Sequence, residues 1–85
     1  MNQFEIQFNL GGRLHSALVT EMVGTEANQY SIVPQEETIL RRFGTQIIHV
    51  YHVGHRNIAF PVKHVEQQAF WGVVGSCLRQ TLRLP

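Results

Sequence analysis

Hydrophobic and polar residues alternate along the first ten positions of the chain. In QFEIQFNL, residues 3–10, every second residue is hydrophobic and the residues between them are Gln, Glu or Asn. Phe4, Ile6, Phe8 and Leu10 therefore fall on one side of an extended chain. A period of two predicts a β-strand with one buried face.

A Gly-Gly pair separates this strand from a second one over 13–23. Gly11 and Gly12 can adopt the positive φ angles that a two-residue hairpin loop requires. The register that this loop implies pairs Phe8 with His15, Ile6 with Ala17 and Phe4 with Val19. The other face of the second strand is not properly polar, since it carries Leu14, Ser16, Leu18, Thr20 and Met22. Either the register is shifted by one residue, or this second face is partly covered as well.

Further along, the pattern predicts a turn over 24–28, a short strand over 29–33 and a helix over 34–43. Pro34 suits the first helical position, where a missing N–H costs nothing. Glutamates in the first turn and arginines in the last complement the helix dipole, and Gly44 can provide a left-handed cap.

The second half of the chain predicts two more strands and a long helix. Residues 45–53 are β-branched and aromatic, which favours a strand, and 54–57 form a turn before a short strand over 58–60. The long helix follows Pro61 and extends to about Leu82. We expect one side of it to pack on the sheet through Val62, Val65, Ala69, Val73 and Cys77, with Phe70 and Val74 at its margin.

This order of elements predicts an α+β fold. We expect a small antiparallel or mixed β-sheet of four to five strands, starting with the N-terminal hairpin, packed on one face by the long C-terminal helix, plus one short helix. With 85 residues, the chain is expected to form a single α+β domain over 1–85.

Three histidines at a spacing of three, His49, His52 and His55, raise the question of a metal site, and His64 follows shortly after. A metal ion needs imidazole nitrogens that converge on one point within about 2.1 Å. On a strand, however, His49 and His52 point to opposite faces, because their separation is odd. We therefore predict no metal site and no cofactor, and keep these four histidines as weak candidates for metal binding.

The remaining residues do not favour catalysis or nucleic-acid binding. Cys77 is the only cysteine, it lies within the long helix, and His64 is more than three turns away. The net charge of +1, with Lys63 as the sole lysine, does not form the basic stripe that nucleic-acid binding requires. We therefore predict no catalytic residue, and nucleic acid is an unlikely partner.

Composition also suggests where the protein acts. A lone cysteine fits a reducing compartment, residues 1–12 show no secretory signal, and no apolar run is long enough to span a membrane. The expectation is a cytoplasmic protein without a membrane partner.

The long helix suggests a partner surface. Trp71, Leu78 and Leu82 lie nearly opposite Val62, with Gly75 between them, and the chain is too short to cover this second apolar face. One interpretation is that these residues are the edge of a large core face. The other is that Trp71, Gly75, Leu78 and Leu82 form the interface of a homodimer. The sequence thus favours a non-enzymatic interaction domain that binds a second copy or another protein; the alternative is a small ligand- or metal-binding domain that uses the histidines of 49–64.

Overall fold

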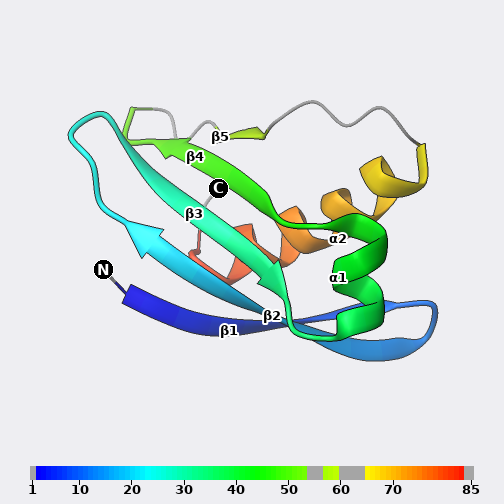
Figure 1. Cartoon of the computed structure of the whole chain (residues 1–85). Coiled ribbons are helices and arrows are strands. Elements are labelled where there is room, and N and C mark those ends of the chain that lie inside the picture. The colour runs from blue at the N-terminus through cyan, green and yellow to red at the C-terminus, as the bar shows by residue number, and fades with distance from the viewer. Residues whose placement is uncertain (1, 54–56, 60–64, 84–85) are drawn as a thin grey trace.

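The computed structural model of the chain describes residues 2–53, 57–59 and 65–83. These residues form two helices and one sheet (Figure 1). The elements in chain order are β1 (Asn2–Leu10), β2 (Arg13–Met22), β3 (Ala27–Pro34), α1 (Glu37–Phe43), β4 (Gln46–Tyr51), β5 (Asn57–Ala59) and α2 (Val65–Thr81).

The sheet has five strands in the order β1-β2-β3-β4-β5, and every neighbouring pair is antiparallel. The predicted register of the first hairpin is confirmed, since Phe8 pairs with His15, Ile6 with Ala17 and Phe4 with Val19. Its loop consists of Gly11 and Gly12, with φ angles of 60° and 77°. Two positive φ angles in a two-residue loop are the property of a type I′ turn, and glycine adopts both without steric strain.

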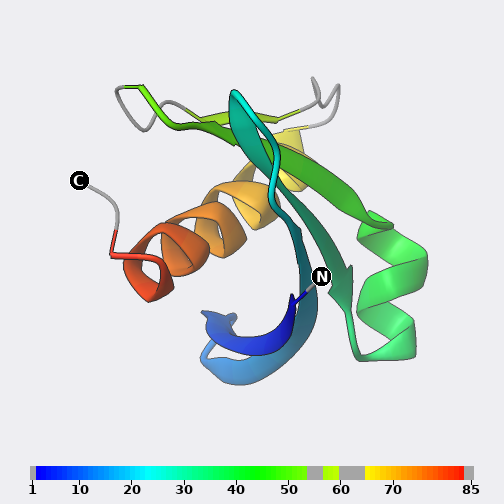
Figure 2. The ribbon, with the colours of Figure 1, turned by 90° about the vertical axis from the view of Figure 1, so that its left-hand side faces the viewer.

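The helix α2 covers one face of this sheet, which we call the core face. Figure 2 shows the twisted sheet curving around α2, with β1 below the helix and β4 and β5 above it. The α+β fold predicted from the sequence is therefore confirmed. Among the described residues, no helix has the length and apolar character needed to cross a membrane. The core consists of Ile6, Phe8, Ala17, Val19, Tyr30, Ile32, Phe43, Ile48, Val50, Phe70, Trp71, Val74 and Leu78.

α2 is rotated about its axis relative to the prediction: Phe70 and Val74, expected at the margin of the side that faces the sheet, are buried at its centre. Phe70, Trp71 and Leu78 are 1%, 8% and 1% exposed, whereas Ala69 and Val73, which were expected to face the sheet, are exposed. Both sides of the helix carry apolar residues, so periodicity alone does not choose between them. Burying the side with Phe, Trp and Leu removes more apolar surface from water than burying Ala, Val and Cys, and this decides the orientation.

The short helix begins later than predicted. Pro34 is not its first residue but the last residue of β3, where it pairs with Ala17. The next amide, that of Gln35, still donates a hydrogen bond of 3.0 Å to the carbonyl of Ser16 in β2. The nitrogen of Pro34 therefore faces the β4 side, where the ladder has already ended at Ile32. A proline fits there because no hydrogen bond of the sheet is lost.

The predicted charge pattern of α1 is present, and Gly44 ends the helix with a positive φ, although its ψ of −152° differs from that of a left-handed α cap. Glu37 in the first turn pairs with Arg41 at 2.6 Å, and Gly44 has a φ of 74° while its amide bonds to Leu40. The phenyl rings of Phe43 and Phe70 stack with their centroids 4.0 Å apart.

Several predicted boundaries are shifted. β3 begins at Ala27, inside the expected turn, and β4 covers 46–51 rather than 45–53. β5 begins at Asn57, one residue before the predicted start. The predicted starts of the long helix at Pro61 and Val62, and most of the predicted turn at 54–57, lie outside the described residues.

Candidate interaction surface

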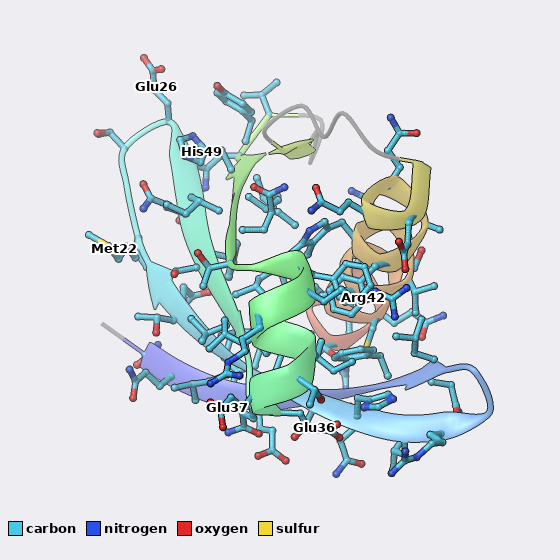
Figure 3. The ribbon with its side chains drawn as sticks, turned by 45° about the vertical axis from the view of Figure 1, so that its right-hand side comes forward. Met22, Glu26, Glu36, Glu37, Arg42 and His49 are labelled. Atoms are coloured by element: carbon cyan, nitrogen blue, oxygen red, sulfur yellow. The ribbon has the colours of Figure 1, made fainter. Side chains whose placement is uncertain are left out.

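The described histidines lie in different parts of the fold. His15 is on the core face, while His49 projects from the opposite, outer face of β4, on the same side as Met22 (Figure 3). His52 follows β4, and its Nε2 lies 3.0 Å from the carbonyl oxygen of Gly24, to which it donates a hydrogen bond. His55 and His64 lie outside the described residues. Within the described ranges, no group of three His, Cys, Asp or Glu side chains could hold a metal ion.

The four predicted interface residues face the interior of the chain. Trp71 and Leu78 are buried, Gly75 is half-buried, and Leu82 packs against the core. The ring of Trp71 contacts that of Phe70 edge-on at 4.9 Å. The interpretation that these residues are part of one large core face therefore describes their position.

That other side of α2 borders an open groove of about 540 Å³ next to β1. The helix contributes small or short side chains, and the strand contributes Gln7, Phe8 and Asn9. Val73 is 39% exposed there. The helical residues that line the groove are Ala69, Gly72, Val73, Ser76, Cys77 and Gln80.

β1 lies at one edge of the sheet, so half of its backbone groups point away from β2. In a hairpin with a two-residue loop, the flanking pair, here Leu10 and Arg13, exchanges backbone hydrogen bonds, and the bonded pairs then alternate along the ladder. The even-numbered residues of β1 thus bond to β2. The odd-numbered residues Gln3, Glu5, Gln7 and Asn9 direct their N–H and C=O groups to the free edge.

A side-chain contact agrees with this assignment. The thiol of Cys77 donates a hydrogen bond of 2.9 Å to the carbonyl oxygen of Gln7. This carbonyl must point away from β2 for a residue of α2 to reach it. Within the part of the chain that the structure describes, no other hydrogen bond to this edge is seen. Cys77 is therefore a half-buried side chain that contacts the edge strand, and among the described residues no basic partner that would activate its sulfur is seen.

The free edge of β1 lacks several of the features that usually prevent strands from pairing between molecules. Such features are lysine or proline on the edge, a β-bulge, a very short strand, or a helix that covers the edge. Here α2 lies beside β1 and reaches its edge through the Cys77 thiol. β1 has nine residues, contains neither lysine nor proline, and pairs with β2 without interruption from Asn2 to Leu10. Its single charge, Glu5, lies on the outer face of the sheet and not along the edge.

The outer face of the sheet is partly apolar, as the sequence indicated. Leu14 and Met22 are 59% and 48% exposed, and Leu18 pairs directly with Val33 across β2 and β3. The register is not shifted by one residue, so the first alternative of the sequence is wrong. The second alternative, a cover over this face, is not provided by α2, which packs on the core face.

One polar cluster borders the core at the other end of the sheet. The hydroxyl of Tyr30, which is 4% exposed, donates a hydrogen bond of 2.8 Å to Glu21 and accepts one of 3.4 Å from Asn28. Burial raises the pKa of the Tyr30 phenol; the hydrogen bond from Asn28 lowers it, while the bond to Glu21 and the negative charge of that carboxylate raise it. The buried phenol remains protonated at neutral pH and acts as a structural donor.

Comparisons with protein-family models, with curated proteins and with solved structures find no match to this chain. The candidate surface therefore rests on the geometry of β1 and α2. Sequence reasoning missed it because the position of a strand within a sheet depends on long-range pairing. Two signals were nevertheless visible: the Gly-Gly loop, which sets the hydrogen-bonding parity of β1, and the lack of lysine and proline in residues 2–10.

Proposed function

We propose that this protein is a non-enzymatic interaction domain that self-associates, and that the free edge of β1 is the surface through which it does so. One observation carries the proposal: β1 offers nine uninterrupted residues of edge without a protective lysine, proline or bulge. Pairing with another strand satisfies backbone groups of this edge, of which the Gln7 carbonyl already accepts a bond from Cys77. Adding a strand to an exposed edge is a common way for domains to bind a partner.

The alternative, a metal- or ligand-binding domain that uses His49, His52, His55 and His64, has less support. The side chain of His49 projects from the outer face of the sheet, and that of His52 is engaged with the Gly24 carbonyl. An enzymatic role has less support still, since Cys77 bonds to a backbone carbonyl and not to a base. We further propose a cytoplasmic location, because a lone thiol fits a reducing compartment.

The experiment is light scattering on a size-exclusion column over a range of protein concentrations, with and without EDTA. We expect a dimer at micromolar concentration that a chelator does not change. A monomer at all concentrations would reject self-association. A species that dissociates or unfolds in EDTA would favour the histidine alternative, because a metal that binds only the folded state stabilises it.

A variant pair tests whether the edge of β1 is responsible. The Gln7→Pro substitution removes an outward-facing N–H without removing a hydrogen bond to β2, because Gln7 is an odd-numbered residue of β1. We expect it to give a folded monomer. The Gln7→Ala substitution removes the same side chain but keeps the N–H, and should remain dimeric. Circular dichroism of both variants confirms that the sheet is intact.

A further inference from the structure

The edge of β1 also indicates which residues meet across the dimer. We propose that two copies pair antiparallel through β1 about a two-fold axis at Ile6, and that Phe4 of each copy enters the groove between β1 and α2 of the other. This inference rests on the proposed self-association and specifies its register.

The length of β1 favours this register. Ile6 is the central residue of Asn2–Leu10, so an axis at Ile6 is the antiparallel arrangement in which all nine residues of each strand overlap. It places Gln3 opposite Asn9 of the second copy, and Glu5 opposite Gln7. These are the odd-numbered residues, whose backbone groups face the edge in both copies. Each such pair can exchange two backbone hydrogen bonds. The register with full overlap therefore also places the edge-facing residues of the two copies directly opposite each other.

The charge of Glu5 also favours the register with the axis at Ile6. An axis at Glu5 would place the two Glu5 carboxylates directly opposite each other, which destabilises a strand pair. With the axis at Ile6, each Glu5 carboxylate instead faces the Gln7 amide of the second copy, which can donate a hydrogen bond to it. The outer face of the joined strands then has only Gln, Glu and Asn side chains along this seam: Gln3, Glu5, Gln7 and Asn9 from each copy.

The groove next to β1 explains how the core face accommodates a second strand. In this register Phe4 of the second copy lies opposite Phe8, which lines the groove. Phe4 is only half-buried in its own chain, although it packs against the core. The α2 side of the groove is formed by Ala69, Gly72, Val73 and Ser76, whose small side chains leave room for a phenyl ring. Because the arrangement is symmetric, each copy supplies one Phe4 and one groove.

Cys77 does not oppose this pairing. Its thiol occupies one lone pair of the Gln7 carbonyl, and a carbonyl oxygen has two. The N–H of Glu5 from the second copy can use the other. An S–H···O bond is weak, so the thiol can also yield its position at little cost.

Cross-linking tests the register directly. Cys77→Ser removes the native thiol, and Glu5→Cys and Gln7→Cys are then made separately in that background. Both side chains lie on the outer face and are exposed, so the fold is not disturbed. Directly opposed residues of a hydrogen-bonded pair have Cα atoms about 5.5 Å apart, which a disulfide can span. We expect mild oxidation to cross-link the mixture into a heterodimer at least tenfold more than either variant alone.

Each other outcome has a defined meaning. Self-linking of the Glu5→Cys variant would place the axis at Glu5, and self-linking of the Gln7→Cys variant would place it at Gln7; either result overturns the proposed register. A dimer by light scattering that forms none of these links would overturn the proposed register while leaving self-association intact. A monomer would reject both the register and the proposed function.

The contact of Phe4 with the groove is tested by a second measurement. Substituting Val73→Lys places a charge in the groove at a position that is already exposed in the single chain. We expect the dimer dissociation constant to rise at least tenfold. The control is Leu14→Lys, which places the same charge on the outer face. It should leave the dimer dissociation constant within about twofold of that of the unsubstituted protein. Equal effects of the two substitutions would contradict the seating of Phe4 in the groove.

Discussion

Oε1 of Glu36 lies 2.8 Å from Nδ1 of His15, and this contact joins the residue before α1 to the core face of β2. The side chain of His15 is 7% exposed, whereas that of Glu36 is 43% exposed. The carboxylate thus supplies a partner for a ring nitrogen that is shielded from water. On the far side, the ring of His15 lies 5.9 Å from that of Phe8, so it also contributes to the core.

Removing the carboxylate should destabilise the fold. We expect Glu36→Ala to lower the free energy of unfolding by about 1–3 kcal/mol, since it leaves a buried polar nitrogen without its partner. Glu36→Gln should recover most of this loss, because the amide oxygen can accept the same hydrogen bond. Urea unfolding followed by circular dichroism measures both. The control is Glu37→Ala, whose ion pair with Arg41 is exposed and should contribute under about 0.5 kcal/mol. Equal losses for Glu36 and Glu37 would contradict this account.

Trp71 should matter to the single chain and not only to a dimer. Truncating a buried aromatic residue costs about 3–5 kcal/mol, so we expect Trp71→Ala to unfold most of the protein even when it is dilute. Trp71 is the only tryptophan, so circular dichroism must replace fluorescence in this measurement. Val73→Ala on the exposed side of the same helix should change monomer stability by less than about 1 kcal/mol. A folded, monomeric Trp71→Ala variant of near-normal stability would show that this side chain is an interface residue after all.

Tyr30 should make the protein sensitive to alkaline pH. Its pKa is raised above the ordinary value of 10.0 in the folded chain. Above pH 10 the unfolded chain releases the phenolic proton while the folded chain still retains it, so the stability present at lower pH is lost as the pH rises. We expect the free energy of unfolding to fall between pH 10 and the higher pKa of the folded state.

The Tyr30→Phe substitution should make this part of the pH profile flatter, at the cost of a lower stability at neutral pH, because Glu21 and Asn28 lose a shared partner. Thermal unfolding measured in steps of pH tests both effects. An unchanged slope above pH 10 in the variant would assign the alkaline sensitivity to another group.

Two glycines should respond to alanine in opposite directions. Gly44 has a φ of 74° and a ψ of −152° at the end of α1, a conformation essentially restricted to glycine that costs an alanine roughly 1–3 kcal/mol. Gly75 lies in the interior of α2, and a Cβ added there meets no atom within 4 Å. Gly75→Ala should therefore raise the free energy of unfolding by about 0.5–1 kcal/mol through helix propensity. Chemical denaturation measures the free energy of unfolding of both variants, and each variant serves as the control for the other. A Gly75→Ala variant that is less stable than the unsubstituted protein would show that this position needs a close backbone approach.

The parts of the fold that local patterns determine could be predicted from the sequence. The period of two in residues 3–10 and the loop of Gly11 and Gly12 together predict the first hairpin and its pairing, although β1 begins one residue earlier and β2 ends one residue earlier than expected. Gly44 likewise predicts the end of α1. In each case the determining interactions are between residues close in the chain.

The parts that depend on tertiary contacts could not be predicted in this way. Both sides of α2 are apolar, so the choice of Trp71 over Val73 for the core depends on how much surface the sheet can bury. Pro34 is compatible with a helix start and with a strand end, and the pairing with Ala17 decides between them. The edge position of β1, on which the proposed interface depends, follows from the order of all five strands.

The order of the strands in the sheet is also their order in the chain, and this has a consequence for folding. Strands that are neighbours in sequence can pair as successive hairpins, each closing only a short loop, which favours rapid formation of the sheet. The contact between α2 and β1 is different, since it joins the most distant elements of the chain. During synthesis, the residues of β1 through β4 therefore leave the ribosome before those of α2. Until α2 follows, the apolar side chains of these strands lack the helix that covers them, and exposed apolar surface of this kind favours aggregation.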